Sequence, residues 1–154
     1  MRISTLVYAR KGGEILLGLK KKGFGVGKWN GFGGKVNHGE SIENAAVREL
    51  AEEAGIATLT ADLLHLAKLH FRSGKEELNW DTHVFVCSRW QGEPIESGEM
   101  RPQWFHGNSI PYHLMWVDDI HWLPLVLAGK KIEATFYFNE AGDEIEKHII
   151  KEVD

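Results

Sequence analysis

The sequence predicts an α/β fold, in which a mixed sheet is sandwiched between two principal helices. Three observations predict it. Several short apolar segments have the length and composition of strands, a capped stretch after Ser41 has apolar residues at helical spacing, and a second apolar stretch follows Asp118. Strands that alternate with helical segments favour layers in which helices cover a sheet.

The first two strands are expected to form a hairpin. Leu6–Ala9 and Glu14–Leu19 have strand composition, and Lys11-Gly12-Gly13 between them has the chemistry of a tight turn. The stretch Gly23–Gly39 that follows is dense in glycine, yet it also contains aromatic side chains. We therefore expect an ordered loop there rather than a flexible linker.

The clearest helix is expected from Ser41 to Ala54. Ser41 suits the N-cap, and Gly55 suits the left-handed position that ends a helix. The apolar stripe at helical spacing is Ile42, Ala45, Ala46 and Leu50.

The second half of the chain predicts more strands and one more helix. The expected strands are Leu63–Phe71, Asp81–Trp90, Gln103–Phe105, Ile132–Phe138 and Glu144–Val153, the last two forming a hairpin. The run His83–Cys87 lacks alternation, which predicts a strand buried on both faces. A helix is expected over Asp118–Ala128, with Pro124 inside it.

Composition and charge exclude several classes of protein. A chain of 154 residues is expected to form one domain, residues 1–154, and its formal net charge of −4 argues against binding to duplex nucleic acid. No apolar run reaches the ~18 residues of a membrane helix. The single cysteine, Cys87, favours a reducing compartment, so we expect a cytoplasmic protein.

Three glutamates near the end of the first helix point to a divalent cation. Glu49, Glu52 and Glu53 are three and four residues apart, so they share one helix face. Their charges repel, and the helix dipole disfavours anions at this end. A cation removes both penalties, and carboxylate oxygens suit Mg²⁺ or Mn²⁺ better than Zn²⁺. Taken alone, the pattern also fits a solvated acidic helix face.

The residues around these glutamates resemble a known signature. Gly34, Glu40, Arg48-Glu49-Leu50, Glu52-Glu53 and Gly55-Ile56 match every fixed position of the Nudix box, over residues 34–56. The chain thus resembles the Nudix hydrolase superfamily, whose fold is an α/β/α sandwich with the box as a loop–helix–loop. The resemblance implies hydrolysis of a diphosphate linkage in a nucleoside diphosphate joined to another group.

The resemblance also implies roles for the box residues. The implied metal ligands are Gly34, Glu49, Glu52, Glu53 and, from a remote loop, Glu99. Glu96 is the second choice for the remote ligand. Arg48 orients a glutamate through a charge-assisted hydrogen bond, and Glu40 supports the loop. Glu52 or Glu53 deprotonates the attacking water, and the sequence leaves that choice open.

The rest of the chain resembles one branch of the superfamily, the animal-type MutT homologues that hydrolyse 8-oxo-dGTP. The similar segments are 16–25, 28–36, 99–105 and 115–125. In this branch a Trp stacks on the purine, while two adjacent Asp and an Asn read its edge. The implied substrate-binding residues are Trp116 as the platform, Asp118, Asp119 and Asn30 as the readers, and Thr5, Lys20, Phe24, Gly33, Phe71, Trp80 and Trp122 as the lining.

The implied function is Mg²⁺-dependent hydrolysis of oxidised purine nucleoside triphosphates to monophosphate and pyrophosphate. Two adjacent carboxyls in a dry pocket do not both ionise, so a shifting proton would admit more than one oxidised purine. Val117, Ser73 and Trp80 depart from the branch, which expects Pro, an aromatic residue and Met there. These departures leave open which purine nucleotide is preferred: 8-oxo-dGTP, 2-hydroxy-dATP, a methylated purine nucleotide or a ribonucleotide.

Two alternatives remain at this point. One is a Nudix enzyme for another substrate, such as ADP-ribose, a dinucleoside polyphosphate or capped RNA. The other is a catalytically silent Nudix module that only binds.

Overall fold

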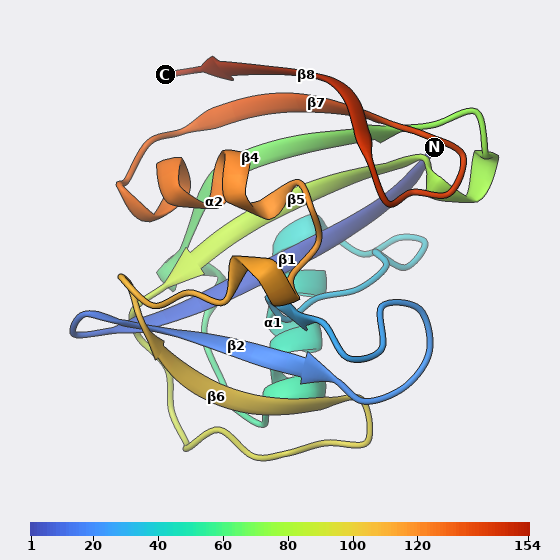
Figure 1. Ribbon diagram of the computed structural model, residues 1–154. Coiled ribbons are helices and arrows are strands. Elements are labelled where there is room, and N and C mark those ends of the chain that lie inside the picture. The colour runs from blue at the N-terminus through green and yellow to red at the C-terminus, as the bar shows by residue number, and fades with distance from the viewer.

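The computed structural model describes residues 1–154, and a mixed sheet forms its middle layer (Figure 1). The strands are β1 (Arg2–Lys11), β2 (Glu14–Lys20), β3 (Trp29–Asn30), β4 (Leu63–Arg72), β5 (Trp80–Cys87), β6 (Met100–His106), β7 (Ile132–Phe138) and β8 (Ile145–Glu152). The α-helices are α1 (Ile42–Ala54) and α2 (Asp119–Leu127). Short 3₁₀ turns are η1 (Thr60–Asp62), η2 (Glu76–Leu78) and η3 (Tyr112–Leu114).

β1 joins the two halves of the sheet. The strand order is β3-β2-β1-β5-β4-β7-β8, and β6 pairs with β2. β1 runs parallel to β5 over Arg2–Ala9, and its last residues form the predicted hairpin with β2. β4 runs parallel to β7, and the remaining strand pairs are antiparallel.

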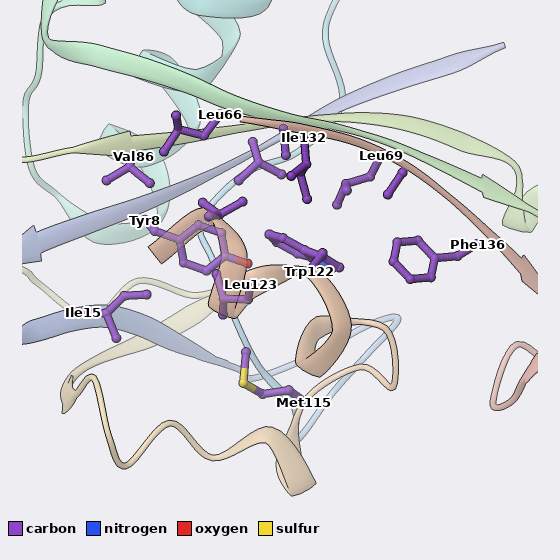
Figure 2. Close-up of a cluster of buried hydrophobic side chains, with 14 of the residues drawn as sticks. Tyr8, Ile15, Leu66, Leu69, Val86, Met115, Trp122, Leu123, Ile132 and Phe136 are labelled. Carbon is purple, nitrogen blue, oxygen red and sulfur yellow. The ribbon is translucent and has the colours of Figure 1, made fainter. Parts of the chain in front are cut away.

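The two helices cover opposite faces of the sheet. On β5, Val84 and Val86 belong to the buried cluster that contains Trp122 of α2 (Figure 2). The intervening Phe85 and its neighbour Cys87 belong to the cluster that contains Leu50 of α1. Because successive side chains of a strand point to opposite faces, α1 and α2 lie on different sides. The predicted α/β/α sandwich is confirmed.

The predicted helix boundaries agree closely with the structure because their signals are local. The Ser41 hydroxyl accepts a hydrogen bond from the Asn44 amide at 3.1 Å, and Gly55 has the left-handed φ of 71°. The prediction that the strand beginning near Asp81 extends to Trp90 was wrong, because β5 ends at Cys87. The chain leaves the sheet there, and Trp90 stacks on Trp104 with ring centroids 5.8 Å apart.

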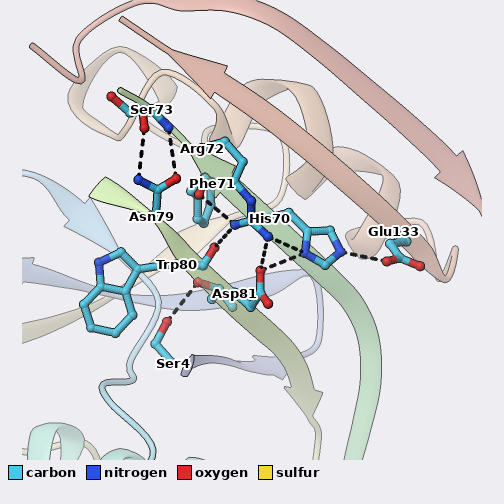
Figure 3. Close-up of polar contacts among 10 residues, drawn as sticks. Ser4, His70, Phe71, Arg72, Ser73, Asn79, Trp80, Asp81 and Glu133 are labelled. Atoms are coloured by element: carbon cyan, nitrogen blue, oxygen red, sulfur yellow. Dashed lines mark hydrogen bonds and ion pairs between the residues drawn. The ribbon is translucent and has the colours of Figure 1, made fainter. Parts of the chain in front are cut away.

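A polar network connects three strands at one end of the sheet (Figure 3). His70 of β4 lies between two carboxylates, Asp81 of β5 at 2.8 Å and Glu133 of β7 at 2.7 Å. Arg72 donates a further hydrogen bond to Asp81 at 2.9 Å.

The loop of the Nudix box lies along the free edge of β1. The Thr5 amide donates to the Gly34 carbonyl at 2.9 Å, and the Val36 amide donates to the Ile3 carbonyl at 2.9 Å. A Cβ on Gly33 would lie 1.7 Å from the Thr5 carbonyl oxygen, so only glycine permits this approach. No helix has the length and hydrophobicity needed to cross a bilayer.

Candidate active site

A cavity of about 420 Å³ opens beside this loop, between β1, the segment after β2 and the start of α2. Most of the predicted substrate-binding residues line it: Thr5, Lys20, Phe24, Asn30, Gly33, Phe71, Trp80, Trp116, Asp118 and Asp119. Gly34 and Glu53 of the box line the same cavity. The aromatic end and the acidic end of the site therefore share one space.

Arg48 holds the box together. Its guanidinium donates to both carboxylate oxygens of Glu40, at 2.7 and 2.9 Å, and to Glu49 at 2.8 Å. It also reaches Glu52 at 3.3 Å and the Lys35 carbonyl at 3.2 Å. The hydrogen bonds from Arg48 lower the pKa of Glu40 to about 2, and the Asn37 amide adds to this effect. One planar donor thus links the helix to its preceding loop.

Glu53 and Glu52 differ sharply in environment. Glu53 is 7% exposed and accepts a hydrogen bond from the Gly33 amide at 2.8 Å, whereas the Glu52 side chain is 58% exposed. Burial and, to a smaller extent, the Glu49 charge raise the pKa of Glu53, the hydrogen bond from the Gly33 amide lowers it, and the net value is about 7. A carboxylate that titrates near neutral pH is suited to take a proton from water.

The acidic end has the donors for a divalent cation but no ready-made metal centre. No group of three acidic or histidine side chains converges in the structure. Glu49 is bound to Arg48, and its carboxylate lies against Gly34, where a Cβ would come within 2.6 Å of Oε1. Carboxylate oxygens next to an open glycine backbone fit a hard cation, so the donor set is compatible with one.

The two candidates for the remote ligand occupy different positions. Glu99 pairs with Lys20 at 3.2 Å, and Lys20 lines the cavity. Glu96 pairs with Lys21, whose side chain does not line it. The Glu99 side chain is 47% exposed and does not line the cavity itself. Of the two glutamates, Glu99 is the one that contacts a residue of the cavity lining.

The base end combines an aromatic platform with two buried carboxyls. Phe24 contacts Trp116 at a centroid distance of 5.0 Å. Asp118 and Asp119 are 4% and 2% exposed. Burial raises the pKa of both carboxyls, that of Asp119 well above its usual value because the Asp118 charge adds to the effect. Burial therefore favours a state of the pair in which one carboxyl keeps its proton over a state in which both are ionised.

Several polar atoms at this end are free to bind a ligand. The Asn30 side-chain oxygen accepts a hydrogen bond from the Gly31 amide at 2.9 Å, which leaves its amide nitrogen as a donor. Thr5 Oγ1 and Asp119 Oδ2 are buried without a hydrogen-bond partner. Buried polar atoms without partners are uncommon, and a bound ligand is one way to satisfy them.

One predicted lining residue is misplaced. Trp122 was expected in the pocket, but it is fully buried beneath it and packs against Tyr8. Its indole nitrogen donates to Asp118 Oδ2 at 2.7 Å. Trp122 therefore contacts a predicted base-binding residue but does not line the cavity itself. A tryptophan one turn after Asp118 on an apolar helix equally fits a core position, and only the packing decides.

The departures from the animal branch have different consequences. Trp80 lines the cavity, but Ser73 does not. The Ser73 backbone pairs with the Asn79 side chain (Figure 3), and its hydroxyl donates to the Asn139 carbonyl at 3.3 Å. Leu78 and Phe138 supply apolar lining near this place. Val117 is 41% exposed and does not line the cavity.

Sequence reasoning missed Lys28. This residue lines the cavity, and its ammonium lies 5.1 Å from the centroid of the Trp116 ring. Its charge opposes the rise in the pKa of Asp119. The only available signal was its position directly before Trp29-Asn30, within a segment already similar to the animal branch.

The fold and this constellation define a Nudix domain, and the chain belongs to that family: residues 1–126 match the NUDIX domain model. The oxidized purine nucleoside triphosphate hydrolase of Danio rerio is 49% identical over 99% of this chain and 96% of its own length. The protein of the same description from Mus musculus is 46% identical over the same shares.

Solved structures agree on the fold. A MutT protein from Bacillus halodurans has a TM-score of 0.82 at 20% identity, covering 98% of both chains. A MutT Nudix hydrolase from Burkholderia pseudomallei has a TM-score of 0.69 at 27% identity, covering 77% of this chain and 93% of that one.

Proposed function

We propose that the protein is a Mg²⁺-dependent pyrophosphohydrolase of oxidised purine nucleoside triphosphates, which releases the monophosphate and pyrophosphate. The observation that carries the proposal is the buried Asp118–Asp119 pair beside Trp116, in the same cavity as Glu53. The descriptions of the two animal relatives support the same substrate class. The biological role would be removal of damaged nucleotides before a polymerase uses them.

The acidic end of the cavity would carry out the hydrolysis. Mg²⁺ held by Glu49, Glu52, Glu53 and the Gly34 backbone, with Mn²⁺ as a substitute, would neutralise charge on the phosphate oxygens. Glu53 is our choice for the base, because its burial keeps its pKa close to neutral pH. Arg48 holds Glu49 in place, and Lys20, which lines the cavity, would contribute a positive charge beside the phosphates. Glu99 keeps Lys20 in position and is our choice for the remote ligand.

The aromatic end would select the base. Stacking of a purine on Trp116 is worth roughly 1–3 kcal/mol. Asn30 would donate to one edge of the base, while the Asp118–Asp119 pair would offer one donor and one acceptor to the other. A shift of the shared proton would reverse that order and admit a second kind of oxidised purine.

The remaining parts of the proposal concern the whole chain. We treat residues 1–154 as one domain, since β7 and β8 continue the same sheet beyond the matched residues. We place the protein in the cytoplasm, where its nucleotide substrates occur and where the buried Cys87 stays reduced.

Hydrolysis of 8-oxo-dGTP and dGTP, each with Mg²⁺ and with EDTA, tests the proposal. We expect a preference for 8-oxo-dGTP of at least tenfold in kcat/KM, which corresponds to ~1.4 kcal/mol, with release of pyrophosphate. Trp116→Ala should lower kcat/KM for 8-oxo-dGTP. Faster turnover of ADP-ribose, a dinucleoside polyphosphate or capped RNA would replace this substrate class with another. Absence of metal-dependent turnover on the whole panel would indicate a binding module.

A further inference from the structure

Tyr8 of β1 carries a buried hydroxyl that the proposed mechanism does not use. The side chain is 0% exposed, and its hydroxyl hydrogen has no acceptor. An unpaired buried hydroxyl costs about 1–3 kcal/mol, and phenylalanine would fill the same space without that cost. A tyrosine at this position therefore calls for an explanation outside packing.

The hydroxyl end of Tyr8 lies between the two parts of the site that read the base. On one side it abuts Gly31, which follows Asn30, so closely that a Cβ there would lie 2.7 Å from Tyr8 Cζ. On the other side the ring packs edge to face on Trp122, with centroids 6.1 Å apart. Figure 2 shows the oxygen of Tyr8 pointing toward α2, the helix that begins with Asp119.

A second buried atom without a partner lies at the start of the same helix. Asp119 Oδ2 has no donor, whereas Asp118 Oδ2 accepts the Trp122 indole hydrogen. Burial and the charges of Asp119 and Asp118 raise the pKa of Tyr8 well above its usual value, so the phenol keeps its proton. The Asp119 charge thus acts on Tyr8, and this donor without an acceptor and this acceptor without a donor form no hydrogen bond with each other in the ligand-free protein.

We propose that Tyr8 is a positioning residue for base recognition, whose hydroxyl donates to Asp119 in the nucleotide-bound pocket and thereby sets which carboxyl of the pair carries the proton. The inference rests on the proposed function, which assigns the Asp118–Asp119 pair to the purine edge. A donated hydrogen bond favours the ionised form of Asp119, so the shared proton moves toward Asp118.

This bias would select among oxidised purines. The edges of guanine and adenine present their donor and acceptor in opposite order, so each kind needs the proton on a different carboxyl. Other charged or titratable groups also face the pair: Lys28 from the loop, Tyr112 from η3 and His121 from α2. Of the phenols that face it, Tyr8 is fully buried, whereas Tyr112 is partly exposed.

The test compares wild type with Tyr8→Phe on 8-oxo-dGTP and 2-hydroxy-dATP over a range of pH. The ratio of the two kcat/KM values cancels contributions common to both substrates, such as that of Glu53. We expect this ratio to change at least threefold in the variant. We also expect the midpoint of its pH dependence to move to higher pH, because Asp119 loses a donor to its ionised form.

Two further variants make the result specific. Tyr8→Leu removes the same hydroxyl and should shift the ratio in the same direction. Tyr137→Phe removes a phenol from the exposed side of β7, where Tyr137 is 40% exposed, and should leave both the ratio and its midpoint unchanged.

Thermal melting separates a role in recognition from an idle group. An idle hydroxyl predicts that Tyr8→Phe melts at a higher temperature, with the ratio and its midpoint equal to those of wild type, and this result would overturn the inference. A wild-type enzyme that does not prefer oxidised purines to dGTP would instead refute the proposed function. The two failures are therefore distinguishable.

Discussion

At the scale of single residues, side chains that look equivalent in the sequence differ in their solvent exposure in the structure. Glu52 and Glu53 are adjacent on the same helix, and their spacing from Glu49 does not identify the base. In the structure, Glu53 is buried against the box loop and bound by Gly33, while Glu52 faces solvent. The distinction arises from how β1 and the loop cover α1, which no local pattern encodes.

Glu53→Gln tests that distinction in the metal-free protein. The pKa of Glu53 rises from 4.5 to about 7 on folding. The contribution of protonated Glu53 to the free energy of unfolding is therefore fully present below pH 4.5 and is lost as pH rises through about 7. Wild type in EDTA should therefore lose on the order of 3 kcal/mol between these limits, and the variant should not. Urea denaturation at pH 5 and pH 8 measures the difference.

The control for this experiment is Glu52→Gln, because Glu52 is exposed and should keep the wild-type pH dependence. Hydrolysis should fall by about 10²–10⁴-fold in Glu53→Gln if Glu53 is the base. Equal pH dependence of stability in wild type and Glu53→Gln would show that burial does not shift this carboxyl.

At the scale of elements, local sequence signals predicted the boundaries that depend only on neighbouring residues. The boundaries of α1 followed from Ser41 and Gly55, because caps depend only on neighbouring residues. β5 ends at Cys87, before the predicted end at Trp90, and Trp90 instead packs on Trp104 of β6, a contact that the local sequence does not indicate. The path of the glycine-rich loop likewise depends on β1, whose amides and carbonyls bind it.

Gly34→Ala tests whether the close approach of the box loop to Glu49 of α1 is needed for metal binding. The added Cβ would lie 2.6 Å from Glu49 Oε1, the flexible end of a side chain, so Glu49 should move and the fold should survive. We expect a higher Mg²⁺ concentration at half-maximal activity and at least a tenfold lower kcat, with little change in Tm. Metal titration of activity and thermal melting measure these effects.

Two other glycines provide the comparison. Gly33→Ala would bring a Cβ within 1.7 Å of the Thr5 carbonyl oxygen, which is backbone and cannot yield, so we expect a loss of about 3 kcal/mol or more in stability. Gly74→Ala meets nothing closer than 3.9 Å and should resemble wild type. An unchanged metal requirement in Gly34→Ala would contradict the role assigned to this glycine.

At the scale of the whole molecule, the layers were predictable but the order of strands was not. Apolar strands and two helices implied a covered sheet, yet nothing in the spacing of residues pairs β1 with β5 or β4 with β7. The box end of the site could be predicted from one contiguous segment. The base end could be predicted only by resemblance, because its residues come from segments as distant as Thr5 and Asp119.

Asp81→Asn tests how the strands are held together at the end of the sheet that contains His70. Burial raises the pKa of Asp81, but hydrogen bonds from His70 and Arg72 outweigh it, and the net shift is downward from 3.8. The stabilisation is therefore present above pH 3.8 and is lost as pH falls through the lower value of the folded protein. We expect the variant to lose about 1–3 kcal/mol at pH 7, because His70 and Arg72 keep their burial without a charged acceptor. Its stability should also decline less than that of wild type between pH 4 and pH 2, as urea denaturation at several pH values would show.

Glu133→Gln alters the exposed side of the same histidine and should lower the free energy of unfolding less, since the Glu133 side chain is 49% exposed. A parallel acid decline in wild type and Asp81→Asn would mean that other carboxylates govern acid unfolding.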